Sequence, residues 1–222
     1  MNWLTVSAFG GIVGVDATSF AQTMISRPLM AATITGFLMG RPTEGLFLGS
    51  LLELFAIVIL PVGAARYPET GTAGVAATAA YMSATPLLSP SVALLAVLFS
   101  LVWEQVAGRS VVLSRRFNET FVRFDASEAS AERAFEWRHR TAIIIDFVRA
   151  FLVTLTGTAI GTLAIRGLSQ FWNLGASVAP AILSIGVCCM VAAVLPLFGG
   201  LRAQKLAFGV GVVFGLLLLL LQ

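Results

Sequence analysis

The sequence predicts an all-α integral membrane protein with about six transmembrane helices, additional re-entrant or partial segments, and a cytoplasmic amphipathic helix. Hydrophobic residues make up 58% of the 222 positions and charged residues only 11%, whereas a soluble protein is about one quarter charged. The charge is also uneven, because residues 109–140 hold seven of the 14 basic residues and five of the 11 acidic residues. Lipid must therefore be the solvent for much of the chain.

Eight apolar segments follow one another along the chain, at 2–20, 28–40, 44–62, 72–88, 90–107, 141–166, 176–199 and 204–222. Six of them are close to the roughly 20 residues that a helix needs to cross a bilayer. Segment 28–40 is short, and segment 72–88 is weakly hydrophobic and rich in alanine and threonine. Such segments are tolerated at membrane depth where protein or a water-filled cavity surrounds them. We therefore expect six full spans and two partial segments, within a single membrane domain of residues 1–222.

Residues 60–74, LPVGAARYPETGTAG, are predicted to be irregular because they combine two prolines with three glycines. Two interpretations remain open. The segment could be an ordinary aqueous loop. It could also line a cavity, because it follows a span that contains Glu53 and itself carries Arg66 and Glu69.

The charged stretch 109–140 has a helical pattern, in which Leu113, Phe117, Phe121 and Phe124 are separated by arginines and acids. This pattern predicts an amphipathic helix that lies on the membrane surface or docks a partner. Its seven arginines place the stretch in the cytoplasm, because basic residues in short loops oppose translocation.

A group of polar residues follows the first apolar run. Asp16, Ser19 and Gln22 are spaced three positions apart, and on a continuous helix they would share one face. Their carboxylate, hydroxyl and amide groups are of the kind that hydrogen-bond sugar hydroxyls, because each hydroxyl both donates and accepts. The alternative is that Asp16 and Ser19 cap a helix end at the membrane interface.

Glu53 lies near the middle of the apolar run GSLLELFAIVIL. An acid in this position must face a cavity, pair with a cation or be protonated. We favour a cavity-facing role, and a purely structural pair with Arg27 or Arg66 is the alternative.

Other polar and charged residues near the span ends have simpler interpretations. Glu104 and Gln105, at the end of a span beside Arg109, are expected to anchor that span at the interface. Asp146 and Arg149 are three positions apart just inside a later span, which is typical of a local ion pair.

The sequence contains no motif that indicates catalysis. It has no GxxxxGK[ST] nucleotide-binding loop, no GxSxG elbow and no HExxH zinc motif. The single histidine, His139, lies between two arginines in EWRHR, where a solvated or lipid-facing position is favoured over a phosphohistidine. We expect no catalytic residue, no metal ligand, no cofactor and no nucleic-acid partner.

Two sequence blocks carry a family resemblance. The block GGIVGVDATSFAQTMISRPLMAATITGFLMG resembles the N-terminal signature of the IIC subunit of mannose–fructose–sorbose phosphotransferase systems (PTS), and EGLFLGSLLELFAIVILPVGAARYPE resembles a second block of the same family. The positions that match the first pattern are Asp16, Gln22, Ser26, Arg27 and Pro28; those that match the second are Gly49, Glu53, Gly63, Pro68 and Glu69. The resemblance covers about residues 9–75, and the remainder agrees only in hydrophobic outline and in the basic stretch.

This resemblance implies a multi-pass sugar permease subunit in the inner (plasma) membrane of a bacterium, surrounded by lipid. It implies a hetero-oligomer with a IID membrane subunit, served by cytoplasmic IIA and IIB proteins. The chain would bind a hexose or amino sugar and pass it to IIB, which carries the phosphoryl group on its own histidine. The residues expected to bind substrate are Asp16, Gln22, Ser26, Arg27, Glu53, Arg66 and Glu69.

Two other functions remain open. The chain could be a non-transporting assembly subunit, in which Asp16, Gln22 and Glu53 serve only in packing. It could also be an ion-coupled secondary transporter, in which Glu53 is the coupling acid.

Overall fold

In the computed structural model, helices joined by loops make up the described residues, which are 3–57, 68–85, 89–122, 131–172, 174, 178–206, 209–211 and 213. The helices are α1 (Trp3–Thr18), α2 (Pro28–Leu38), α3 (Pro42–Ala56), α4 (Thr70–Ala84), α5 (Pro90–Val122), α6 (Ala131–Ser169), α7 (Val178–Val194), the short 3₁₀ helix η1 (Leu195–Phe198) and α8 (Gly200–Ala203). The predicted all-α class is confirmed. Most of the expected last span, 204–222, lies outside the described residues.

Three helices within the described residues are long and apolar enough to cross a membrane, over Pro90–Thr120, Phe135–Ser169 and Pro180–Phe198. The helices α1 and α2 are apolar but shorter. The 11 residues of α2 span about 16 Å at a rise of about 1.5 Å per residue, roughly half of the 30 Å hydrocarbon core. This length agrees with the prediction that segment 28–40 is a partial crossing.

A tight hairpin is formed by α2 and α3, whose backbones touch at glycines. A Cβ atom added to Gly45 would lie 2.6 Å from the backbone oxygen of Ala32, and one added to Gly49 would lie 2.8 Å from that of Leu29. The two glycines are four positions apart on α3, which is the G-x-x-x-G spacing that lets helices approach closely in membranes. Each helix has a proline in its first turn, where the missing N–H leaves no hydrogen bond unmade.

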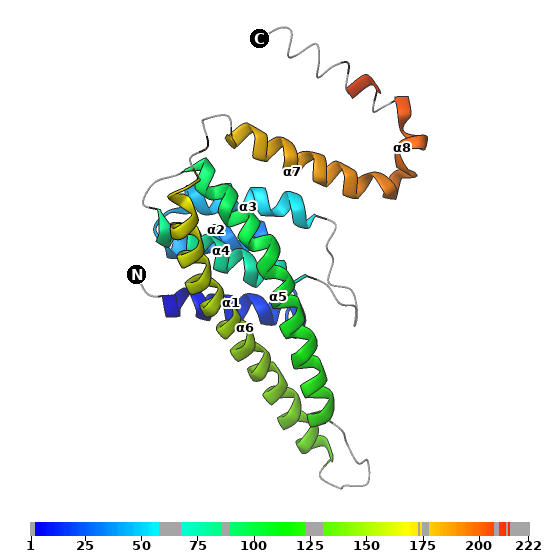
Figure 1. The fold of residues 1–222 in the computed structure, drawn as a ribbon. Coiled ribbons are helices and arrows are strands. Elements are labelled where there is room, and N and C mark those ends of the chain that lie inside the picture. The colour runs from blue at the N-terminus through cyan, green and yellow to red at the C-terminus, as the bar shows by residue number, and fades with distance from the viewer. Residues whose placement is uncertain are drawn as a thin grey trace.

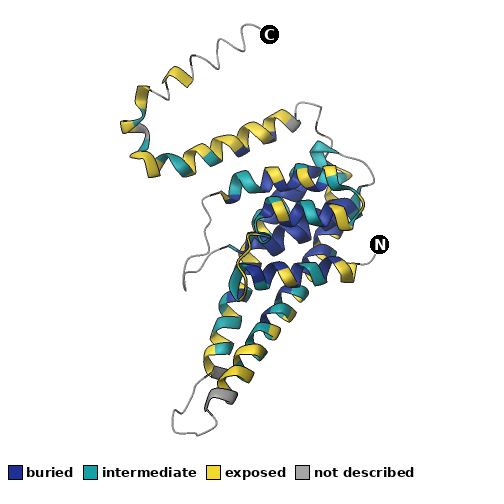
Figure 2. Ribbon diagram, turned by 180° about the vertical axis from the view of Figure 1, so that it is seen from behind, coloured by how far each residue is buried: buried dark blue, intermediate teal, exposed yellow. Residues whose placement is uncertain are grey.

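The centre of the helical body is occupied by α4. Twelve of its 15 residues are buried, from Gly71 to Met82, and Figure 2 shows the buried helices gathered there. It packs against α1, α2, α5 and α6. The alanine, glycine and threonine residues that make the segment weakly hydrophobic also allow its neighbours to approach closely. The expectation of a short segment enclosed by protein agrees with this position.

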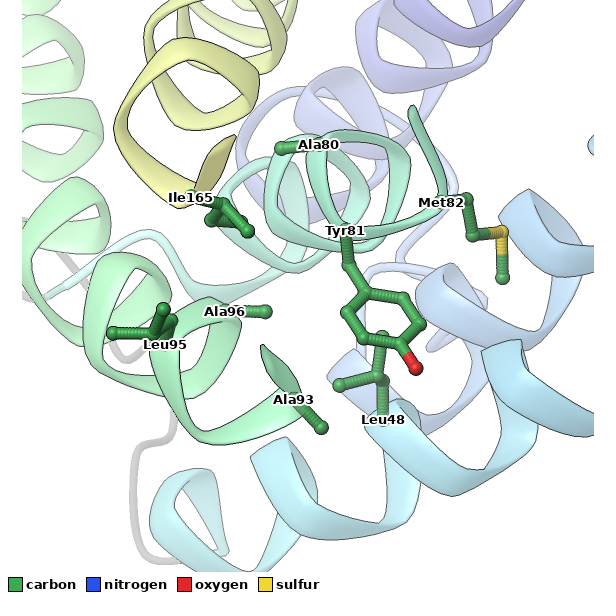
Figure 3. Packing of buried hydrophobic residues seen from close by; sticks show 8 residues of the cluster. All are labelled: Leu48, Ala80, Tyr81, Met82, Ala93, Leu95, Ala96 and Ile165. Carbon is green, nitrogen blue, oxygen red and sulfur yellow. The ribbon is translucent and has the colours of Figure 1, made fainter. Parts of the chain in front are cut away.

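Tyr81 anchors the C-terminal end of α4. Its ring lies beside Leu48 of α3 in the cluster drawn in Figure 3. Its hydroxyl accepts a hydrogen bond from the backbone N–H of Ser89 at 2.8 Å, and the guanidinium of Arg41 lies 5.7 Å from the ring centroid. Arg41 also donates to the backbone oxygen of Thr85 at 2.6 Å. The α2–α3 turn is therefore fastened to the end of α4.

The C-terminal part of α5 and the N-terminal part of α6 lie side by side and project beyond the helical body (Figure 1). We call this pair of helix ends the stem. The helix α5 runs without interruption from its apolar part to Val122, and α6 begins at Ala131. The helical pattern expected in 109–140 therefore belongs to the ends of two long helices and not to a separate surface helix. A continuous helix and a surface helix have the same periodicity, so the sequence does not distinguish them.

The helix α7 packs against α3 and α5 and is largely exposed in this single chain (Figure 2). Apolar side chains on it are uncovered, among them Leu183, Ile185 and Val187. Such a surface is expected of a helix that lipid or another membrane subunit surrounds.

Candidate functional site

Asp16 organises the loop between α1 and α2. Its Oδ1 accepts hydrogen bonds from the backbone N–H and the hydroxyl of Thr23, at 2.6 and 2.7 Å, and its Oδ2 accepts one from the N–H of Ser26 at 3.1 Å. The residue is only 3% exposed. Because α1 ends at Thr18, the helical face expected to carry both Asp16 and Gln22 is interrupted. Neither Asp16 nor Ser19 caps the end of α1 with its side chain, because Asp16 binds the loop that follows the helix and Ser19 binds Asp146.

This loop has a strained backbone. Ala21, Gln22 and Met24 have φ angles of 72°, 50° and 68°, a region that residues other than glycine rarely adopt. Such residues persist where their surroundings impose the conformation, and they cluster at binding and catalytic sites. Here the hydrogen bonds to Asp16 fix the loop, and the side chain of Gln22 is exposed on it.

Arg27 and Glu53 form an ion pair at the start of α2. The Nε of Arg27 donates to Oε1 of Glu53 at 2.8 Å, and its terminal nitrogen contacts the same oxygen. The other oxygen, Oε2, accepts the backbone N–H of Leu29 at 3.1 Å, which satisfies an otherwise unpaired amide of the first helical turn. The two side chains are 18% and 21% exposed. Glu53 was expected to face a cavity, with a structural pair to Arg27 or Arg66 as the alternative. The structure contains the pair with Arg27 and leaves the carboxylate of Glu53 partly accessible.

The same loop contacts the start of α4. A Cβ atom added to Gly71 would lie 2.5 Å from the backbone oxygen of Ser26. Glu69 immediately precedes α4 at its N-cap position. The two sequence blocks are therefore brought together around Ser26 and Arg27, with Asp16 on one side and Glu53 on the other.

Glu69 is directed into the interior and not toward the α1–α2 loop. It is 1% exposed, and its carboxylate binds Arg149 at two points, with distances of 2.8 Å to NH1 and 3.2 Å to NH2. Its backbone N–H donates to the backbone oxygen of Glu104 at 3.1 Å. In this conformation both oxygens of Glu69 are occupied by protein donors.

Arg149 is the centre of a network that the sequence did not reveal. Its Nε donates to Oδ1 of Asp146 at 2.7 Å, and its NH1 also reaches the hydroxyl of Ser110 at 3.0 Å. The other oxygen of Asp146 accepts hydrogen bonds from the hydroxyls of Thr18 and Ser19. The local Asp146–Arg149 pair was expected, but its extension to α1, α4 and α5 was not. We call these residues, together with Glu69, the polar network.

Gly14 makes room for this network on α1. A Cβ atom at this position would lie 2.2 Å from the Cβ of Ala150, and 3.3 Å from Oε1 of Glu69. The first of these distances is far shorter than carbon atoms allow. The glycine-rich character of the first apolar run therefore has a specific use, since it lets α1 pack directly against α6.

The remaining predicted positions have mixed outcomes. Arg66 lies outside the described residues. Glu104 is 8% exposed, so it is buried among helices and does not anchor the span at the surface. His139 is exposed on the stem, where its ring stacks on that of Phe135 with centroids 6.2 Å apart.

Comparisons with known proteins agree on one family. The chain matches the family model described as PTS system sorbose-specific iic component over residues 1–172. It is 27% identical over 166 residues to the fructose permease IIC component of Bacillus subtilis (strain 168), which covers 73% of this chain and 58% of that protein. It is also 27% identical over 157 residues to the PTS system sorbose-specific EIIC component of Lacticaseibacillus casei, which covers 68% of this chain and 51% of that protein. The chain thus spans a little over half the length of these curated relatives.

Proposed function

Because the chain belongs to the family of sorbose-specific IIC components of phosphotransferase systems, we propose that it is a sugar-translocating permease subunit. In this proposal it crosses the bacterial inner membrane several times as a single membrane domain. It binds a hexose or amino sugar and passes the sugar to a cytoplasmic IIB protein for phosphorylation.

One observation carries this proposal. The two sequence blocks that resemble the family meet at the α1–α2 loop, where Asp16 binds the N–H of Ser26 and the next residue, Arg27, binds Glu53. A strained loop is held beside a partly exposed ion pair. A buried rigid support next to exposed polar groups is the arrangement that a binding site for a small polar molecule requires.

The contacts support a different proposed role for each of the predicted residues. The carboxylate of Glu53 has about four lone-pair sites, and three donors occupy it: two from Arg27 and one from Leu29. No other donor from the described residues reaches Oε2, so one site on it can take a sugar hydroxyl. Gln22 offers an amide from the exposed side of the loop. Asp16 and Glu69 are 3% and 1% exposed and bind protein donors through both carboxylate oxygens, so we assign them to positioning the site.

Partners complete the proposed reaction. A IID-type membrane subunit would cover the exposed faces of the chain, and the phosphoryl group would move from a histidine nitrogen of IIB to a sugar hydroxyl oxygen, which releases its proton. IIA would recharge IIB. The charge gained by the sugar prevents its return across the membrane, since a charged group in the hydrocarbon core is costly. The arginine-rich stem, which the positive-inside rule places in the cytoplasm, lies on the side where IIB would approach.

Uptake by cells that produce this chain with IID and IIB tests the proposal. Radiolabelled fructose, sorbose, mannose and glucosamine should be compared, and at least one should accumulate as a phosphate ester only when all three proteins are present. Uptake of free sugar without IIB, driven by a sodium or proton gradient, would instead support the ion-coupled transporter. A stably assembled complex that takes up none of them would support the assembly subunit.

A further inference from the structure

A small polar cavity lies beside the polar network, between the end of α1 and the stem helices. It has a volume of about 80 Å³ and is partly open. Its walls are formed by Thr18, Ser19, Val111, Ser114, Arg115, Asn118 and Asp146. All but one of these residues are polar, in a chain that is 58% hydrophobic.

One wall of this cavity contains a polar atom without a partner. The side-chain oxygen Oδ1 of Asn118 is buried and accepts no hydrogen bond from the residues that the structure describes. Leaving a buried acceptor unpaired costs about 1–3 kcal/mol, and most such groups in folded proteins are satisfied by protein, water or a ligand. No donor from the described residues reaches this oxygen, so a water or a bound molecule in the cavity would complete it.

The charges around the cavity select the kind of molecule that fits. Asp146 contributes a carboxylate from α6, and Arg115 contributes a guanidinium from α5. Arg149 already neutralises Asp146, whose other oxygen accepts from the hydroxyls of Thr18 and Ser19. Because these two hydroxyls already donate to Asp146, they present acceptor lone pairs to the cavity, as does Oδ1 of Asn118. The guanidinium of Arg115 disfavours a cation, and an anion without hydrogens has nothing to donate, so a neutral molecule with hydroxyl donors fits best.

We propose that this cavity is a subsite for the hydroxyl-bearing edge of a neutral sugar, occupied after the sugar leaves the α1–α2 loop. This inference rests on the proposed function, because a sugar permease would bring such a molecule to the cavity. Ser19 both begins that loop and lines the cavity, so the two positions are adjacent. The volume holds two or three waters at about 30 Å³ each, or two to three hydroxyl groups, while the rest of the ring projects through the opening.

The cavity lies on the side of the chain where a phosphoryl donor would approach. Val111, Ser114, Arg115 and Asn118 belong to the arginine-rich part of α5, which the positive-inside rule places on the cytoplasmic side. A sugar held there would present its free edge to a cytoplasmic phosphoryl donor. The subsite should therefore affect transfer to IIB more than capture of sugar from outside.

Cavity-filling variants test this inference in cells that contain the chain with IID and IIB. Ser114→Leu and Asn118→Leu place apolar atoms in the cavity, and Thr120→Leu is the matched control, since Thr120 is exposed on the same helix and does not line the cavity. For the sugar that wild type transports best, the two variants should lower the maximal rate about tenfold or more, the effect of losing one hydrogen bond. The KM should change less than about threefold, because the variants leave the capture site intact. The loss of one hydrogen bond at the capture site itself would change the KM about tenfold.

A thiol-labelling experiment reports occupancy directly. Ser114→Cys is made in a background with Cys188→Ser and Cys189→Ser, because both native cysteines are exposed. In inverted membrane vesicles that contain the complex, the transported sugar should slow labelling by a small methanethiosulfonate reagent. A labelling rate that saturating sugar leaves unchanged would show that the cavity holds water only and would overturn the inference. Unchanged rates in Ser114→Leu and Asn118→Leu, with wild-type transport intact, would do the same, whereas a wild type that transports no sugar would overturn the proposed function itself.

Discussion

Arg149 binds Glu69 at two points across 80 positions of sequence, with distances of 2.8 and 3.2 Å between their charged atoms. Their side chains are 9% and 1% exposed, and Asp146 binds the same guanidinium from the other side. One cation thus compensates two buried carboxylates. This arrangement fastens α4, the central helix, to α6.

Removing that cation should destabilise the chain strongly. Arg149→Met leaves Glu69 and Asp146 buried and without their shared cation, and breaking a buried ion pair in this way costs about 3–5 kcal/mol. Thermal unfolding of the detergent-purified protein should show a large fall in the midpoint. Arg140→Met is the control, because the Arg140–Glu136 pair is 75% and 62% exposed and such pairs contribute little. Equal midpoints for the two variants would show that the polar network is not a stabilising element.

Sugar uptake should depend on Glu53 and Gln22. Glu53→Gln keeps the shape but removes the charge, and Gln22→Ala removes an exposed amide. A hydrogen bond to a charged group contributes roughly 1.5–3 kcal/mol, so losing it at Glu53 should raise the KM for uptake about 10- to 150-fold. The neutral amide of Gln22 should contribute less, about 0.5–1.5 kcal/mol.

Assembly distinguishes this role from a structural one. Both variants should still insert and co-purify with the IID partner, as should the exposed control Glu136→Gln, which should also transport normally. If Glu53→Gln abolishes co-purification, the pair with Arg27 is structural, and the sugar site must be sought elsewhere.

The hairpin of α2 and α3 should not tolerate a side chain at Gly45. A Cβ atom there would lie 2.6 Å from the oxygen of Ala32, and backbone atoms can yield only if the two helices separate. Gly45→Ala should therefore cost about 1–3 kcal/mol, as overpacking typically does. Gly167→Ala is a matched control, because a Cβ atom there meets nothing within 4 Å. Comparable unfolding midpoints for both variants would contradict the close backbone contact.

Much of the helical layout was predictable from the sequence because segment length and apolarity have direct physical consequences. The short segment 28–40 became α2 and the small-residue segment 72–88 became the buried α4, since a helix shorter than the bilayer or poor in large side chains must be enclosed by protein. The stem was not distinguished from a surface helix, because both present the same 3.6-residue periodicity.

The contacts of the site were less predictable. The motif around Asp16 was recognisable, but the role of Asp16 was not. The loop that it supports has positive φ angles at Ala21, Gln22 and Met24, and these residue types do not indicate a positive φ in a sequence as glycine does. The pair between Glu69 and Arg149 depends on the packing of α4 against α6, and two residues 80 positions apart reveal no such contact by their spacing. Only the local pair of Asp146 with Arg149 could be read from an i,i+3 interval.

The stem should be cytoplasmic. Seven arginines within 109–140 oppose translocation, so a cysteine at position 127, in the connection between α5 and α6, should resist an impermeant thiol reagent in intact cells. The experiment uses Ser127→Cys with Cys188→Ser and Cys189→Ser, and labelling should appear once the cells are permeabilised. Labelling in intact cells would invert the proposed orientation of the whole chain.

The strained loop should be needed for sugar affinity more than for stability. Ala21→Gly removes one methyl group and relieves a φ of 72°, which is a strain of about 1–2 kcal/mol for a residue with a Cβ. Glycine also gains about 0.4–1 kcal/mol of freedom in the unfolded chain, so the unfolding midpoint should change little. The relaxed loop loses preorganisation, and preorganisation lowers the cost of ordering a site on binding. The KM for the transported sugar should therefore rise severalfold.

Asp16→Asn tests the support of the same loop. Both carboxylate oxygens accept backbone N–H groups, one from Thr23 and one from Ser26, and an amide can accept at only one of these places. The loop should loosen further than in Ala21→Gly, with a larger rise in KM and a loss of about 1–3 kcal/mol from the unpaired donor. Thr33→Val is a suitable control, because it removes a hydroxyl that donates within α2, to the oxygen of Leu29. Should Asp16→Asn transport with the wild-type KM, the loop would have no part in binding the sugar.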